Sequence, residues 1–273
     1  WSPDGTRVAY TCRADKTIAI VDQRYGIIHR INHNRGLDFC DFKFSPDGRF
    51  LVSAGIDGFV RLWENITGNF AQSQAWDTKD GNDREHNPPD TIIDKFIDVS
   101  ISPCCRYIVV STQNRVCLKD VENGGKTIKS WMPPLAVVGC SVNFCYSSDD
   151  HTIFISYIEA DGHDTVMQVW RPYLDDNDNS VFDIWRYGDP QCMSFNFSHN
   201  NKMVAICDNY WKGRLLSIDL NHKCLTHKLD IPGSDGKRLF FTLDDKHIGY
   251  NTERGPKFWS IANNEFTNNS IYV

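Results

Sequence analysis

The sequence predicts an all-β protein built from a repeated unit of four short strands. Residues 44–64 read FSPDGRFLVSAGIDGFVRLWE and residues 1–22 read WSPDGTRVAYTCRADKTIAIVD, so one pattern is present twice. In both copies short apolar runs are separated by turn-forming residues, and helical periodicity is sustained nowhere in the chain. Period-two alternation between turn signals is typical of antiparallel strands.

The second copy shows the elements in order. Residues 42–44 alternate apolar with polar side chains, and the Ser-Pro-Asp-Gly segment at 45–48 is composed of strong turn formers. A second strand begins at residues 50–52, and a tight turn contains Asp57-Gly58. A third alternating strand then ends in Trp63 and Glu64.

Four weaker copies follow at a regular spacing. The first turn residue of each copy falls at positions 2, 45, 102, 147, 198 and 242, which are 43, 57, 45, 51 and 44 residues apart. A period of roughly 40–45 residues is typical of a four-stranded propeller blade. We therefore expect one β-propeller segment over 1–273, with repeats at about 1–32, 37–76, 95–132, 137–188, 191–232 and 236–273.

Two departures from the period have visible sources. Residues 77–91 are polar, contain Pro and Gly, and predict a long insertion loop. Residues 173–180 form a second, acidic excursion.

The first repeat begins inside the pattern, because Trp1 stands where Phe44 stands in the second copy. The first repeat is thus expected to lack its innermost strand. We expect six visible repeats to be part of a seven-bladed ring in a longer protein, with the remainder of its own chain completing the ring.

The repeat resembles the WD40 family over essentially the full chain, most closely at residues 53–64, SAGIDGFVRLWE. In that family a Ser or Thr, an Asp, a Trp and an upstream His form a buried hydrogen-bonded tetrad. The resemblance assigns these roles to Ser53, Asp57 and Trp63, with His33 as a candidate for the fourth. It also implies tetrad-like positions in other repeats at Thr11, Asp15, Asp164, Trp170 and Trp259.

Several repeats depart from the tetrad. Val21 replaces the Trp in the first repeat, and Lys119 replaces it in the third. A buried Asp needs partners to offset its desolvation. We therefore expect these blades to depend more on apolar packing than on polar networks.

Composition limits the classes of function. The net charge of −6 supplies no basic field for general nucleic-acid binding, and no apolar run is long enough to span a bilayer. The ten cysteines include no CxxC pair, and several occupy alternating apolar positions. This pattern favours reduced thiols in a cytoplasmic or nuclear protein.

Catalytic and ligand motifs are weak. The opening also resembles propellers attached to hydrolase domains, but the chain has no GxSxG nucleophile elbow. Residues 175–180 carry alternating oxygen donors, as a calcium loop does, but lack its turn Gly and distal Glu, so a solvated acidic loop is favoured. We expect no catalytic residue, no cofactor and no metal site.

A partner is expected at one end of the strands. In a four-stranded blade, the fourth-to-first and second-to-third connections share one face, and the Ser-Pro-Asp-Gly turns lie on the other. The longest irregular loops are predicted on the first face, where function tends to concentrate. The candidate residues for binding a protein or peptide are Arg35, Asp38, Ile56, His163, Tyr210 and Trp211.

The sequence thus favours a non-catalytic scaffold for protein–protein interaction within a larger intracellular protein or complex. A regulatory or substrate-recruiting propeller, attached to a catalytic domain elsewhere in its chain, is the alternative. A propeller that binds calcium or another ligand is a third class.

Overall fold

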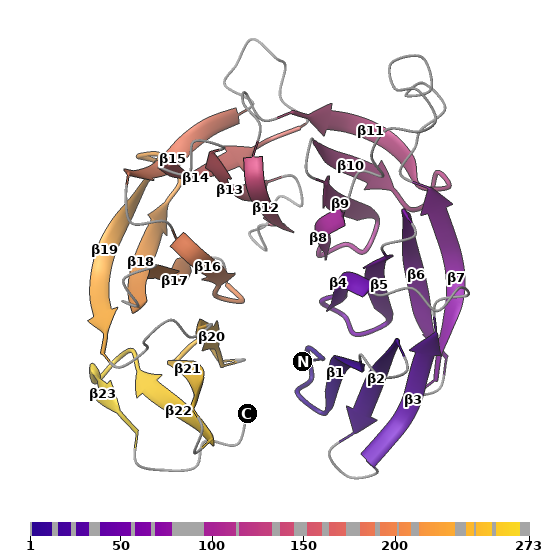
Figure 1. The fold of residues 1–273 in the computed structure, drawn as a ribbon, viewed down its shortest axis with the longest axis horizontal. Helices are drawn as coiled ribbons and strands as arrows, with labels where there is room; N and C mark the ends of the chain where they lie inside the picture. The colour runs from indigo at the N-terminus through magenta and orange to yellow at the C-terminus, as the bar shows by residue number, and fades with distance from the viewer. Residues whose placement is uncertain are drawn as a thin grey trace. The chain divides into compact units, whose positions relative to one another are not determined.

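The computed structural model contains strands and turns but no helix in the ranges that it describes. These ranges are residues 2–12, 16–22, 26–32, 39–55, 58–66, 69–77, 96–112, 115–132, 137–144, 152–159, 164–172, 181–188, 192–200, 202–208, 213–232, 239–242, 244–252 and 255–267. The strands form six antiparallel sheets, each made from consecutive strands. The chain is therefore an all-β propeller with six blades, as the repeat predicts (Figure 1).

The chain divides into two compact units, Trp1–Phe144 and Cys145–Val273. The first blade has three strands, which are β1 (Arg7–Cys12), β2 (Thr17–Asp22) and β3 (Gly26–Asn32). The second blade comprises β4 (Phe39–Phe44), β5 (Phe50–Gly55), β6 (Phe59–Ile66) and β7 (Asn69–Asp77). The third comprises β8 (Phe96–Ile101), β9 (Tyr107–Thr112), β10 (Val116–Asp120) and β11 (Lys126–Trp131).

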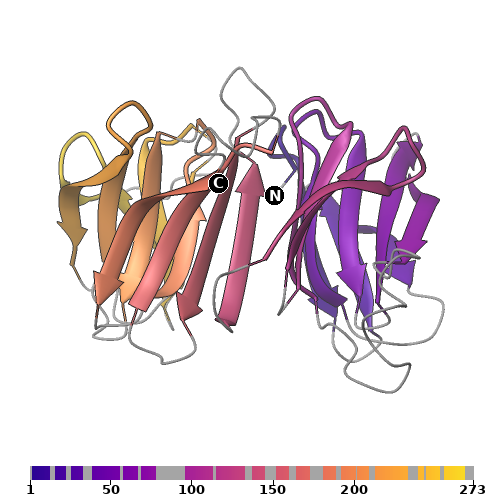
Figure 2. The ribbon, with the colours of Figure 1, turned by 90° about the horizontal axis from the view of Figure 1, so that it is seen from above.

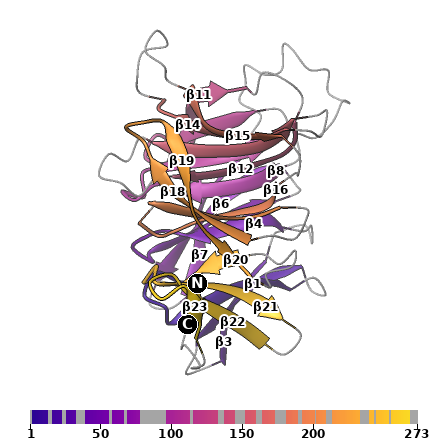
Figure 3. The same ribbon diagram turned by 90° about the vertical axis from the view of Figure 1, so that its left-hand side faces the viewer.

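The fourth sheet has the order β12-β13-β14-β15, with β12 (Val137–Phe144), β13 (Ile153–Glu159), β14 (Asp164–Trp170) and β15 (Val181–Gly188). The fifth blade comprises β16 (Cys192–Phe197), β17 (Met203–Asp208), β18 (Gly213–Asp219) and β19 (Cys224–Ile231). The sixth comprises β20 (Leu239–Phe241), β21 (His247–Thr252), β22 (Gly255–Ser260) and β23 (Glu265–Phe266). The outermost strand of the fifth blade, β19, lies toward the viewer in Figure 3.

The first blade matches its prediction. Its described strands correspond to the second, third and fourth strands of the repeat, in the order β1-β2-β3. In the second blade the added innermost strand is β4, which pairs with β5.

The hydrophobic core of each unit lies between successive sheets. In β5, Leu51 packs with Ile18 and Ile20 of the first blade, while its neighbour Val52 packs with Val99 of the third. Successive side chains of a strand point to opposite faces, so a strand between two blades is buried on both. The run Leu51–Gly55 is accordingly buried throughout.

The second unit is built by the same rule. Phe154 and Val169 of one sheet pack against Val204 and Ile206 of the next, and Leu215 packs with Ile248 of the last. The rings of Phe154 and Phe197 stack with centroids 4.8 Å apart.

Figure 2 shows the strands of each unit side-on. We call the end that carries the first-to-second and third-to-fourth connections the turn end, and the opposite end the loop end. In the second blade, Asn65 N donates to Arg49 O at 2.7 Å, which joins the two connections of the turn end.

Candidate interaction surface

The turns at the turn end are closed by a side-chain network. In the second blade, Ser45 Oγ donates to Asp47 Oδ1 at 2.6 Å, and Arg49 N donates to the same oxygen at 3.0 Å. The amide of Phe50 donates to Ser45 Oγ at 2.9 Å. Ser45 is fully buried, so the turn is a rigid corner between β4 and β5.

The network recurs in the first, third, fifth and sixth blades. In each, the amide five residues after the first turn residue donates to its hydroxyl; the pairs are Arg7–Ser2, Tyr107–Ser102, Met203–Ser198 and His247–Thr242. The third turn residue accepts from that hydroxyl in three of them, which are Asp4, Asn200 and Asp244. In the third blade, Cys104 Sγ takes this place, 3.3 Å from Ser102 Oγ.

The fourth residue of a turn approaches the turn of the preceding blade. It has a positive φ in four turns, at Gly5, Gly48, Cys105 and Asp245. The Cys105 thiol interacts with Asp47, and its burial together with that carboxylate raises the pKa of Cys105 to about 11. Cys105 is thus a protonated, unreactive thiol at neutral pH.

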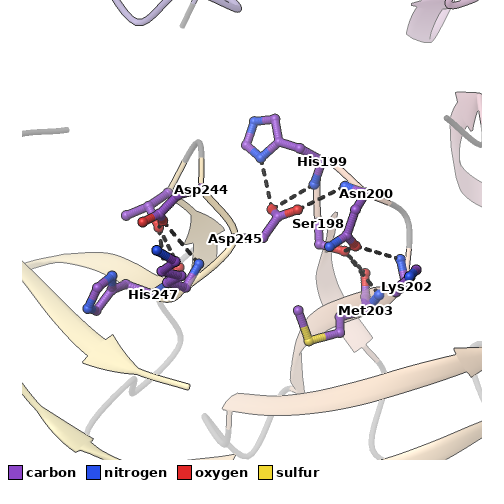
Figure 4. A network of polar contacts seen from close by, with 10 residues as sticks. Ser198, His199, Asn200, Lys202, Met203, Asp244, Asp245 and His247 are labelled. Atoms are coloured by element: carbon purple, nitrogen blue, oxygen red, sulfur yellow. Dashed lines mark hydrogen bonds and ion pairs between the residues drawn. The ribbon is translucent and has the colours of Figure 1, made fainter. Parts of the chain in front are cut away.

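The same position connects two blades in the second unit. Asp245 Oδ1 accepts from His199 N at 2.7 Å and lies 3.0 Å from His199 Nδ1 (Figure 4). Asp245 Oδ2 accepts from Asn200 N at 2.8 Å. One carboxylate therefore ties the turn of the sixth blade to the turn of the fifth.

A hollow of about 440 Å³ opens at the turn end of the first unit, between the turns of the first two blades. Its apolar lining comes from Pro3, Pro46, Phe44 and Phe70. The two phenylalanine rings meet edge to face, with centroids 5.9 Å apart. Its principal polar groups come from Arg7, Arg49, Asp4, Asp47 and Asn65.

The carboxylates of the hollow are occupied by their own turns. Asp47 Oδ2 accepts from Arg49 Nε at 2.5 Å, in addition to the turn bonds of Oδ1. Burial acts to raise the pKa of Asp47, but the hydrogen bonds from Ser45 and Arg49 outweigh it and lower that pKa to about 2. The hydrogen bond from Ser2 likewise lowers the pKa of Asp4.

A second polar cluster lies between β4 and β8, inside the first unit. Asp41 Oδ2 accepts from Val99 N at 3.2 Å, and Lys43 Nζ lies 3.3 Å from Asp98 Oδ1. Burial, followed by the neighbouring charge and hydrogen bond of Asp98, raises the pKa of Asp41. A buried pair of carboxylates of this kind shares a proton more readily than it holds two charges.

The predicted tetrad positions are described only in part. Trp63 Nε1 donates to Ser53 Oγ at 2.9 Å, and both side chains are buried. Asp15 and Asp57 lie outside the described residues, as does His33, and the side chain of Asp164 is not described. The described residues of the tetrad in the second blade are thus Ser53 and Trp63, which form a hydrogen bond.

The strand register determines which residues correspond to this pair. Trp63 pairs with Leu51, and the equivalent partners are Val8 with Val21, Ile153 with Trp170, and Ile248 with Trp259. Ser53 lies two residues after Leu51. The residues two positions after Val8, Ile153 and Ile248 therefore occupy the place of Ser53, and they are Tyr10, Ile155 and Tyr250. Thr11 is therefore one position off the Ser53 place, and it is exposed.

Trp170 and Trp259 are buried without a serine in that place. Trp259 Nε1 has no hydrogen-bond partner among the described residues. In the third blade the Trp place holds Lys119, which is buried and donates to Thr127 Oγ1 at 2.9 Å.

All six residues predicted for the partner face lie outside the described residues; they are Arg35, Asp38, Ile56, His163, Tyr210 and Trp211. The 77–91 insertion, apart from Asp77 at the end of β7, and the acidic 173–180 loop also lie outside them. The hollow was not predicted. Its signal was the basic residue directly after the turn at Arg49, which the sequence repeats at Arg106, Lys202 and Lys246.

Other kinds of site are not seen in the described ranges. These ranges contain no group of three His, Cys, Asp or Glu residues arranged to hold a metal ion. They also contain no helix of the length and apolarity that crossing a membrane requires.

Successive antiparallel sheets, each with a serine- or threonine-closed turn between two of its strands where that turn is described, define a β-propeller protein. Residues 27–64 match the family model for the WD domain, G-beta repeat, and this range includes the Ser53–Trp63 pair. A segment of 38 residues is 40% identical to the WD40 repeat-containing protein smu1 of Dictyostelium discoideum, over 14% of this chain and 7% of the relative. The chain is a β-propeller in which residues 27–64 are similar to a WD40 repeat.

Proposed function

We propose that the chain is a non-catalytic scaffold that binds protein partners within a larger intracellular protein or complex. The observation that carries the proposal is its WD40-type blade architecture, because WD40 propellers generally mediate protein–protein interaction and are generally non-catalytic. A fold class by itself assigns no partner, so the binding surface has to be argued from its residues.

Two surfaces are proposed for this role. The first is the loop end, where the sequence predicts the partner residues; Tyr210 and Trp211 are the candidate anchors, since aromatic side chains are frequent binding hot spots. The turn end carries the hollow between the first two blades. A cytoplasmic or nuclear compartment is part of the proposal, supported by apolar packing of cysteines such as Cys117 and Cys207.

The test is affinity capture with the full-length protein, followed by identification of what it retains. Three variants are compared with it: a deletion of residues 77–91, Trp211→Ala, and Arg49→Glu. Loss of a specific partner in the first two assigns the loop end, and loss in the third assigns the turn end. A protein that retains no specific partner in any form contradicts the scaffold role.

A further inference from the structure

We propose that the hollow between the first two blades binds an extended acidic segment of a partner protein, with a carboxylate side chain at its arginines and an adjacent apolar side chain against its phenylalanines. The inference rests on the proposed scaffold function and specifies the partner chemistry of one surface. It follows from three properties of the lining.

The first property is that the acceptors of the hollow are already used. Asp4 accepts from Ser2 Oγ at 2.5 Å and from Thr6 Oγ1 at 2.9 Å. Both oxygens of Asp47 accept bonds from within its own turn. A basic segment entering the hollow would have to compete with these bonds, which are charge-assisted and short.

The second property is that the guanidinium N–H donors of the hollow remain available to a ligand. Arg49 uses Nε for Asp47, and its side chain is 66% exposed, so a ligand can reach the guanidinium. The guanidinium of Arg7 donates no hydrogen bond in the described ranges, its Nε is buried, and its nearest carboxylate oxygen, Asp22 Oδ2, is 3.9 Å away. A guanidinium presents paired donors that match the geometry of a carboxylate.

The third property is the apolar surface beside these donors. Phe44 is half-buried, and Pro3 and Pro46 border the same hollow. The volume of about 440 Å³ lies in the range of small-ligand pockets and accommodates two side chains rather than a folded element. Donors next to an apolar wall favour a segment in which an acidic residue adjoins an aromatic or aliphatic one.

Rigidity makes the site suitable for an extended peptide. Ser45 and the turn amides hold Asp47, and Asp47 in turn holds Arg49, so the guanidinium is oriented before binding. Asn65 Nδ2 lies 3.5 Å from Gly48 O and links the third-to-fourth turn to the same corner. Pre-oriented groups lose less conformational entropy on binding.

The experiment uses the whole chain and three end-blocked, fluorescently labelled peptides with the sequences Gly-Gly-Glu-Phe-Gly, Gly-Gly-Gln-Phe-Gly and Gly-Gly-Lys-Phe-Gly. Fluorescence anisotropy gives the Kd of each, and amide chemical shifts locate the binding. We expect the Glu peptide to bind about tenfold more tightly than the Gln peptide, as one charge-assisted contact supplies. The difference shrinks as salt is raised, because the arginines are partly exposed.

Arg49→Gln removes the donor at an exposed position and abolishes the preference for Glu over Gln. Arg7→Gln tests the second donor in the same way. Lys246→Gln is the matched control, because Lys246 occupies the place of Arg49 in the turn of the sixth blade, and there the preference stays unchanged. Thermal melts of all variants establish that they are folded.

The inference is overturned if no peptide binds, if the Glu and Gln peptides bind equally, if the Lys peptide binds best, or if Arg49→Gln keeps the preference. A phosphoserine peptide that displaces the Glu peptide at a hundredth of its concentration would also overturn it, in favour of a phosphorylated segment. If Arg49→Glu leaves the captured partners unchanged, the hollow is not their site and the scaffold role stands. Capture of no partner contradicts the scaffold role itself.

Discussion

The indole nitrogen of Trp63 donates a 2.9 Å hydrogen bond to the hydroxyl of Ser53 across β5 and β6. Trp259 occupies the same strand position in the sixth blade, where Tyr250 stands in the place of the serine. Both indoles are buried, but only the first has an acceptor among the described residues. The two blades thus offer the same side chain with and without its polar partner.

Trp63→Phe is expected to lower the free energy of unfolding more than Trp259→Phe does. Both changes remove similar buried volume, but the first also leaves Ser53 without its donor. The difference is about 1 kcal/mol, the net contribution of one buried hydrogen bond. Urea unfolding of the two variants measures it, and equal losses would contradict the assignment of the bond as the distinguishing interaction.

The repeat could be predicted because its signals are local. In the first, second and sixth blades a buried Ser or Thr, an acceptor two residues later and a positive φ at the next position close the corner, and Ser45, Asp47 and Gly48 display all three in sequence. The weaker corner at Thr242 keeps the same bonds with different residues. Spacing between such corners therefore predicts the blades even where Trp is lost.

The strand register and the hollow are harder to predict, since both depend on neighbours distant in sequence. Thr11 and Tyr10 differ by one position, and only the pairing of Val8 with Val21 decides which lies in the Ser53 place. Arg7 and Phe70 line one hollow because two blades pack together. The residues that neighbour Arg7 and Phe70 in the sequence give no indication of that contact.

Gly125 and Gly124 form a matched pair in the third-to-fourth turn of the third blade. Both have positive φ, +72° and +65°, so alanine strains the backbone about equally at the two positions, by about 1 kcal/mol. A Cβ at Gly125 would also lie 2.2 Å from Trp76 Cδ1, whereas a Cβ at Gly124 meets open space. Gly125→Ala should therefore cost about 1–3 kcal/mol more than Gly124→Ala in urea unfolding. Equal costs would show that Trp76 moves aside freely.

Asp245→Asn tests the connection between the fifth and sixth turns. Asparagine tolerates the positive φ of 54°, but it replaces one acceptor oxygen with a donor. The amides of His199 and Asn200 should then exchange hydrogen faster, because they lose part of their shared acceptor. The amide of Asp245 is the internal control, since it donates to Thr242 O within its own turn. Unchanged exchange at His199 and Asn200 would show that the Asp245 carboxylate does not hold the two turns together.

Asp41→Asn is expected to stabilise the protein at neutral and higher pH. The pKa of Asp41 is raised by its burial and by Asp98, so the folded state binds a proton that the unfolded state releases near pH 4. Stability contributed by this group is present below that pH and is lost as the pH rises through the raised pKa of the folded state.

Asparagine resembles the protonated acid, because its carbonyl still accepts from Val99 N and its amide can donate to Asp98. The variant should melt a few degrees higher than the parent at pH 8, and the difference should vanish toward pH 4. Asp98→Asn is the control: it also removes the repulsion but takes away the charged partner of Lys43, so its gain is smaller. A difference in melting temperature between Asp41→Asn and the parent that does not vary with pH would show that Asp41 keeps an ordinary pKa in the folded protein.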